Sequence, residues 1–208
     1  MSAFEFFFSF YGLLLGLSVA AVVGGFANVL HERHRIRFGW LTPLLALFIA
    51  VDIATFWAQA WIIFRAAPFN LALLVVGLVI AGVFYIAASI TFPRVSPDGE
   101  ERLDLDDHFW AHRRMVFACV MIANLIVAVV LGLLAMADDG FAQVASRPRL
   151  WVGLFVFVAF TATAAFAPSR RITASALLLL VAFHGWNLWR AVETLVVAGG
   201  WSPPGAGA

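Results

Sequence analysis

Apolar residues run through this chain in six long stretches, and almost every charged residue lies in the short segments between them. Each stretch is long enough to cross a bilayer as a helix, because roughly 20 residues at about 1.5 Å each cover the ~30 Å hydrocarbon layer. The runs are continuous, unlike the alternating strands of a β-barrel. The pattern therefore predicts an all-α membrane protein, a six-helix transmembrane bundle. The predicted spans are about 6–30, 41–64, 70–92, 115–137, 150–167 and 172–197.

These spans account for most of the 208 residues and leave no room for a separate soluble domain. Only 12% of the residues are charged, whereas a soluble domain carries about 25%. The longest predicted connection runs from Pro93 to Arg114. The sequence predicts a single transmembrane domain over residues 1–198, followed by a flexible tail over 199–208.

The distribution of arginine predicts the orientation of the bundle, since basic residues collect on the cytoplasmic side. The first, third and fifth connections share one side and hold nine arginines, against three in the second and fourth. We therefore expect both termini on the outer, periplasmic side of a bacterial inner membrane. The nine are Arg33, Arg35, Arg37, Arg94, Arg102, Arg113, Arg114, Arg170 and Arg171, and the three are Arg65, Arg147 and Arg149.

All 13 basic residues are arginine, so the chain has no lysine. Retinal and pyridoxal phosphate attach through a lysine Schiff base, so neither cofactor can be bound in that way. A P-loop nucleotide site is excluded for the same reason. Acidic and basic residues are balanced in the connection between the third and fourth spans, which argues against nucleic acid as a partner.

Small residues recur at four-residue spacing along the first span, at Gly12, Gly16, Ala20 and Gly24. Small residues at this spacing allow two helix backbones to approach closely. The spacing predicts a helix-packing face, whose partner is another helix of this chain, a second copy or a different membrane protein. Besides the lipid bilayer, we therefore expect other membrane proteins or copies of the chain as partners.

Three polar residues lie near the middle of predicted spans. Asp52 is about 17 Å into the second span, Asn124 about 14 Å into the fourth and His184 about 18 Å into the sixth. An ionisable group at that depth costs roughly 2.5–3.5 kcal/mol, so it normally faces the bundle interior and a polar partner. Gln59 shares a helix face with Asp52, and Asn187 shares one with His184. These five residues form the predicted mid-membrane polar cluster.

Two interpretations of this cluster remain open from the sequence. In the functional one, the cluster forms a proton or ion pathway, or His184 is an axial ligand to a buried haem. In the structural one, the cluster is a set of interhelical hydrogen bonds that fixes packing, with Asp52 protonated because burial disfavours its charge.

Four histidines form pairs at helix ends that the topology puts on one side of the membrane. His31 and His34 close the first helix, while His108 and His112 open the fourth. Spacings of three and four put each pair on one helix face, as a metal site requires. The alternative, which we favour, is that these are interfacial residues suited to the charge of helix ends. Residues that could complete a metal site are Glu32, Asp104 and Asp107.

The sequence carries no serine, cysteine or carboxylate constellation of a hydrolase, which favours a non-enzymatic protein. Unbroken helices and the small-residue face favour an accessory or assembly subunit of a membrane complex. The alternative is a small transporter or proton-conducting protein that uses Asp52, Asn124 and His184. A second alternative is a membrane oxidoreductase with a histidine-bound metal or haem.

Overall fold

The computed structural model describes residues 3–66, 70–94 and 102–197. Six of its helices are long and apolar enough to cross a membrane, which confirms the predicted all-α architecture and suggests an integral membrane protein. The predicted tail, 199–208, lies outside the described residues. The elements are α1 (Ala3–His31), β1 (Ile36–Arg37), α2 (Leu41–Ala66), α3 (Leu71–Thr91), β2 (Leu103–Asp104), α4 (Leu105–Ala137), α5 (Asp139–Ala145), α6 (Pro148–Phe166) and α7 (Arg170–Val197).

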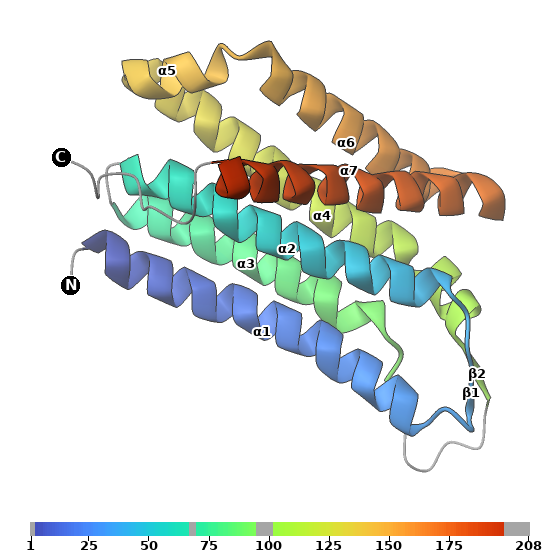
Figure 1. The fold of residues 1–208 in the computed structure, drawn as a ribbon. Coiled ribbons are helices and arrows are strands. Elements are labelled where there is room, and N and C mark those ends of the chain that lie inside the picture. The colour runs from blue at the N-terminus through green and yellow to red at the C-terminus, as the bar shows by residue number, and fades with distance from the viewer. Residues whose placement is uncertain (1–2, 67–69, 95–101, 198–208) are drawn as a thin grey trace.

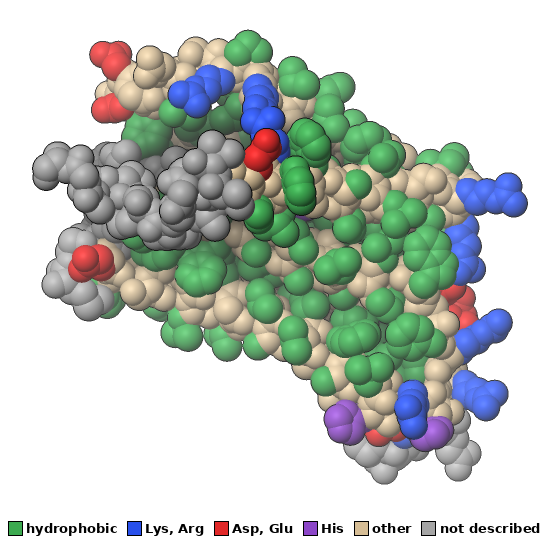
Figure 2. Space-filling view, in the orientation of Figure 1, with side chains coloured by type: hydrophobic (Ala, Val, Ile, Leu, Met, Phe, Trp, Pro, Cys, Tyr) green, Lys and Arg blue, Asp and Glu red, His purple; other side chains and the backbone are tan. Residues whose placement is uncertain are grey.

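The long helices lie side by side, with α2 and α4 at the centre of the bundle (Figure 1). Helices α1 and α3 pack on one side of this centre, and α6 and α7 pack on the other. Helix α1 begins and α7 ends at the same end of the bundle, which we call the terminal end. Strands β1 and β2 lie at the opposite end. Figure 2 shows arginine side chains gathered there, so we call it the arginine-rich end.

Helix α4 begins at Leu105 rather than near residue 115, where the apolar run starts. The side chain of Asp104 caps its first turn by accepting from the backbone nitrogens of Asp106 (2.8 Å) and Asp107 (3.4 Å). Acidic residues in a first turn also suit the positive end of the helix dipole. Arg113, which we predicted to lie in a connection, is therefore inside a helix.

Three short elements had no signature in the hydrophobic pattern. Strands β1 and β2 pair in parallel, with Ile36 opposite Leu103, and Arg37 lies 3.6 Å from Asp104 across the pair. Helix α5 joins α4 to α6 and is capped by the side chain of Asp138, which accepts from the backbone nitrogen of Gly140 at 2.9 Å. These elements are too short to show a periodicity, and each depends on a cap or on pairing with a distant segment.

Helices α6 and α7 pack tightly only toward the arginine-rich end. No residue from 148 to 156 of α6 is buried, and every residue from 185 to 193 of α7 is exposed. In the other half of the pair, small buried residues allow the backbones to approach their neighbours closely. These buried small residues are Thr161, Ala164, Ala165, Thr173, Ala174 and Ala176.

Close glycine contacts between long helices are made by Gly25 of α1 and Gly77 of α3, and a Cβ on Gly39, just before α2, would overlap the Asp106 carboxyl group. A Cβ on Gly25 would come within 2.8 Å of the Phe92 ring, and one on Gly77 within 2.8 Å of the Phe7 ring. The predicted small-residue face of α1 is used differently: a Cβ at Gly12 would lie 3.1 Å from Trp57, but the positions at Gly16 and Gly24 have no atom within 4 Å. Ala20 is exposed as well. Most of this face therefore points away from the rest of the chain.

Candidate functional site

An ionisable pair lies between α2 and α7, near the middle of both helices. The carboxyl oxygen Oδ1 of Asp52 is 3.4 Å from Nε2 of His184, and the two residues are only 2% and 4% exposed. Among the described residues, neither the other carboxyl oxygen, Oδ2, nor Nε2 of His184 makes a hydrogen bond, so the pair is a close approach of two ionisable groups rather than a hydrogen-bonded one. The Asn124 side chain of α4 lies near the carboxyl group, and its Nδ2 donates to the backbone oxygen of Val120 at 3.0 Å. Three of the five predicted cluster residues are thus brought together by three helices.

Thr55 lies on α2 about one helical turn after Asp52 and contacts both members of the pair. Its hydroxyl donates to the backbone oxygen of Asp52 at 2.8 Å and lies 3.5 Å from Nδ1 of His184. A neutral imidazole has one nitrogen that donates and one that accepts. Nε2 can therefore accept a proton from a protonated Asp52, or donate one to its carboxylate. The arrangement suits the exchange of one proton between a carboxyl group and an imidazole.

Aromatic rings enclose the pair on the side of the arginine-rich end. The centroid of the His184 ring lies 5.7 Å from that of Phe48 and 5.9 Å from that of Phe157. Phe48 also contacts Phe117, at 6.0 Å between centroids. We call Phe48, Phe117 and Phe157 the phenylalanine layer; all three are buried. A haem ring at His184 would have to displace these side chains, so the packing does not fit a haem ligand.

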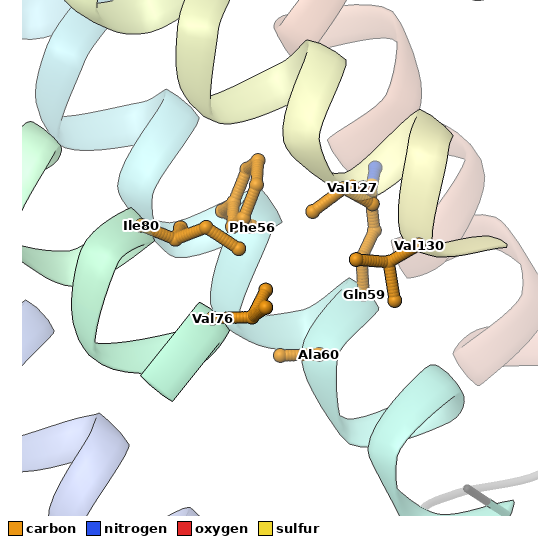
Figure 3. Close-up of a pocket in the computed structure, with 7 residues that line it drawn as sticks. All are labelled: Phe56, Gln59, Ala60, Val76, Ile80, Val127 and Val130. Atoms are coloured by element: carbon orange, nitrogen blue, oxygen red, sulfur yellow. The ribbon is translucent and has the colours of Figure 1, made fainter. Parts of the chain in front are cut away.

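Gln59 and Asn187 lie apart from the pair. Gln59 is seven residues after Asp52, about 10 Å farther along the helix. It reaches toward α4 and lines a small apolar pocket with an interior volume of about 10 Å³, about the room of one water molecule (Figure 3). Asn187 is exposed, and its amide donates to the backbone oxygen of Phe183 at 2.9 Å. The other residues that line the pocket are Phe56, Ala60, Val76, Ile80, Val127 and Val130.

Arg113 is a second buried charged residue, and no pattern in the sequence indicates its burial. It is 4% exposed and donates to the backbone oxygen of Ala164 at 3.1 Å and to Oγ1 of Thr173 at 2.8 Å. Its guanidinium group also lies 3.9 Å from the centre of the Trp110 ring. Ala164 is in the last turn of α6, where the helix dipole is negative and attracts a cation. Arg113 therefore ties α4 to the ends of α6 and α7 that meet at the arginine-rich end.

The four candidate metal ligands are used mainly in local contacts. His31 bonds to the backbone oxygen of Ala27, and His112 to that of His108, both at 3.0 Å. The rings of His108 and His112 stack with centroids 4.2 Å apart, and His34 is exposed. Within residues 3–66, 70–94 and 102–197, no three His, Cys, Asp or Glu side chains are grouped so that they could hold a metal ion.

Comparisons of the chain with models of protein families, with curated proteins and with solved structures found no match. The fold and the pair define a class only: a small α-helical protein with six apolar helices long enough to cross a membrane and an aspartate–histidine pair between two of them.

Proposed function

We propose that the protein is a small membrane transporter or proton conductor in which the Asp52–His184 pair binds and releases a proton. The observation that carries this proposal is the 3.4 Å separation of two ionisable groups from different helices, both buried near mid-span. Each ionisable side chain at this depth costs roughly 2.5–3.5 kcal/mol. Two amide side chains could link the helices at lower cost, so an ionisable pair suits a role in which a proton moves.

The surroundings of the pair support a cycle between two protonation states. With one mobile proton shared between carboxyl and imidazole, the pair is neutral overall and is best suited to its low-dielectric surroundings. Loss of that proton leaves the Asp52 carboxylate beside a neutral imidazole. The Asn124 side chain lies where its amide can then donate to the carboxylate. The pair would thus alternate between net charges of zero and −1.

We propose a bacterial inner membrane as the location, with the arginine-rich end in the cytoplasm. Reporter fusions test this orientation. Green fluorescent protein fused after residue 37 is expected to fluoresce, because that connection would face the cytoplasm, and alkaline phosphatase fused after residue 201 is expected to be active outside. A cytoplasmic signal from the fusion after residue 201 would reverse the orientation.

The second candidate function is the accessory or assembly subunit of a membrane complex. It is favoured by the open face of α1, where Gly16, Ala20 and Gly24 are exposed and nothing lies within 4 Å of a Cβ at either glycine. A face of this kind lets another helix backbone approach closely in lipid. The helix could come from a second copy or from a different membrane protein.

A matched pair of glycine substitutions in α1 tests this second candidate. Gly25→Leu is expected to destabilise the fold by about 1–3 kcal/mol, because the side chain would overlap Phe92. Gly16→Leu is expected to leave the thermal stability of the single chain unchanged, because its side chain enters open space. If α1 docks on a partner, Gly16→Leu will also reduce association, as measured by native mass spectrometry from native membranes. Unchanged association in that variant would remove the support for the accessory role.

A further inference from the structure

The Asp52–His184 pair has different surroundings on its two sides along the bundle axis. Toward the terminal end, Thr55 is half-buried and Gln59 and Asn187 are exposed, while Phe56 of α2 is buried against Phe84 on another face of the helix. Toward the arginine-rich end, the next side chain on α2 is Phe48, one turn before Asp52 and fully buried. The terminal side of the pair therefore accommodates water and ions better than the side toward the arginine-rich end.

The packing of the helices changes at the level of the pair. Phe157 of α6 and His184 of α7 are the last buried residues before the segments, 148–156 and 185–193, in which none is buried. Toward the arginine-rich end, α6 and α7 have buried residues over several turns, so the interior of the bundle is closed there. The phenylalanine layer takes one ring from each of α2, α4 and α6. The closed half of the interface therefore begins at the pair.

A second level of closure lies beyond the phenylalanine layer. Thr161 of α6 is fully buried, and its hydroxyl donates to the backbone oxygen of Phe157 at 2.7 Å, so it offers no free donor to the interior. About one turn farther, Arg113 holds the Ala164 oxygen and the Thr173 hydroxyl. A proton leaving the pair toward the arginine-rich end would have to pass a buried layer of aromatic rings in contact and then a fixed positive charge.

We infer that the pair is reached from the terminal end, and that the phenylalanine layer is the barrier that separates it from the arginine-rich end. That a proton moves along this route rests on the proposed function. The side from which the pair is reached is independent of that proposal. Because the rings of the layer come from different helices, passage requires α6 and α7 to shift relative to α2 and α4. The layer thus acts as a gate, and Arg113 holds the helices that would have to part.

Thiol labelling tests the side of access, because Cys119 is the single cysteine of the chain and can be removed. In a Cys119→Ser background, Thr55→Cys and Thr161→Cys form a matched pair of near-isosteric changes on the two sides of the layer. The purified variants are reconstituted in liposomes and treated with a membrane-impermeant methanethiosulfonate ammonium reagent, and labelling is read by intact mass. We expect Thr55→Cys to react and Thr161→Cys to remain unlabelled. Labelling of Thr161→Cys with Thr55→Cys protected would overturn the inference.

Opening the barrier tests the role of the layer itself. Phe48→Ala is expected to raise passive proton leak across liposomes by about tenfold or more over the parent, because water can enter the space that the ring leaves. Phe84→Ala is the control: Phe84 is equally buried but packs against Phe56, outside the layer. If Phe48→Ala does not fold, Phe48→Leu provides a smaller change with the same expected direction. Equal leak from the Phe48 and Phe84 variants would show that the layer is not the barrier.

The two readouts separate the inference from the proposed function. Labelling at Thr55 but not at Thr161, without any proton flux in the parent, would retain the access route and reject the transporter. Proton flux in the parent with the reversed labelling pattern would retain the transporter and reject the access route.

Discussion

Replacing Asp52 with asparagine is expected to leave the protein folded and to reduce its proton flux to that of protein-free liposomes. An amide can hydrogen-bond where the carboxyl group did, so the change in the free energy of unfolding should stay within about 1 kcal/mol. The asparagine amide does not bind or release a proton near neutral pH, so the mobile proton of the pair is lost. The measurement is the fluorescence of a pH-sensitive dye trapped in proteoliposomes after a pH gradient is imposed.

Two further variants complete this test. His184→Ala is expected to behave as Asp52→Asn does, because the pair then lacks its second proton-binding group. Asp138→Asn is the control, since Asp138 caps α5 at the bundle end and asparagine is an equally good cap. If Asp52→Asn conducts protons as the parent does, the pair is a structural link between α2 and α7, and the proposed function is wrong.

Replacing Arg113 with alanine is expected to cause a large loss of stability. The substitution removes two hydrogen bonds from a charged donor and leaves the Ala164 oxygen and the Thr173 hydroxyl with fewer partners in a buried site. Hydrogen bonds to charged groups contribute about 1.5–3 kcal/mol, so a loss of at least this size is expected. Thermal unfolding in detergent, followed by circular dichroism, measures the effect.

The controls for Arg113 separate charge from packing. Arg113→Met keeps much of the side-chain volume and removes the cost of burying a charge, so it should lose less stability than the alanine variant. Arg114→Ala changes the neighbouring, exposed arginine and should have little effect. A stability of Arg113→Ala equal to that of Arg114→Ala would mean that the contacts of Arg113 do not hold the helices together.

The long helices could be predicted from the sequence because lipid imposes a strong constraint on composition over about 20 residues. The start of α4 could not, since it depends on the capping side chain of Asp104 and on a charged first turn that a hydropathy pattern reads as a connection. For the same reason the hydropathy pattern places Arg113 in a loop. Its partners, Ala164 and Thr173, are more than 50 residues away in the chain.

The pair was accessible to sequence reasoning because Asp52 and His184 are rare residue types in apolar surroundings. The phenylalanine layer was not, since three rings among 21 phenylalanines carry no distinguishing mark. The glycines show the same limit. The four-residue spacing from Gly12 to Gly24 revealed a small-residue face but not the direction in which it points. Closer contacts are made by glycines outside that repeat, such as Gly25 against Phe92 and Gly77 against Phe7.

The wide separation of the pair along the chain has a consequence for how the protein is made. Asp52 precedes His184 by about 130 residues, so in the proposed membrane location α2 would enter the membrane during synthesis long before its histidine partner has left the ribosome. The rest of α2 must therefore offset the insertion cost of the carboxyl group, and α2 is apolar enough to do so. Helix α7 arrives last and is the least apolar of the six spans. In the proposed membrane location we expect the preformed Asp52 site to favour its insertion, so that completion of the pair would coincide with completion of the chain.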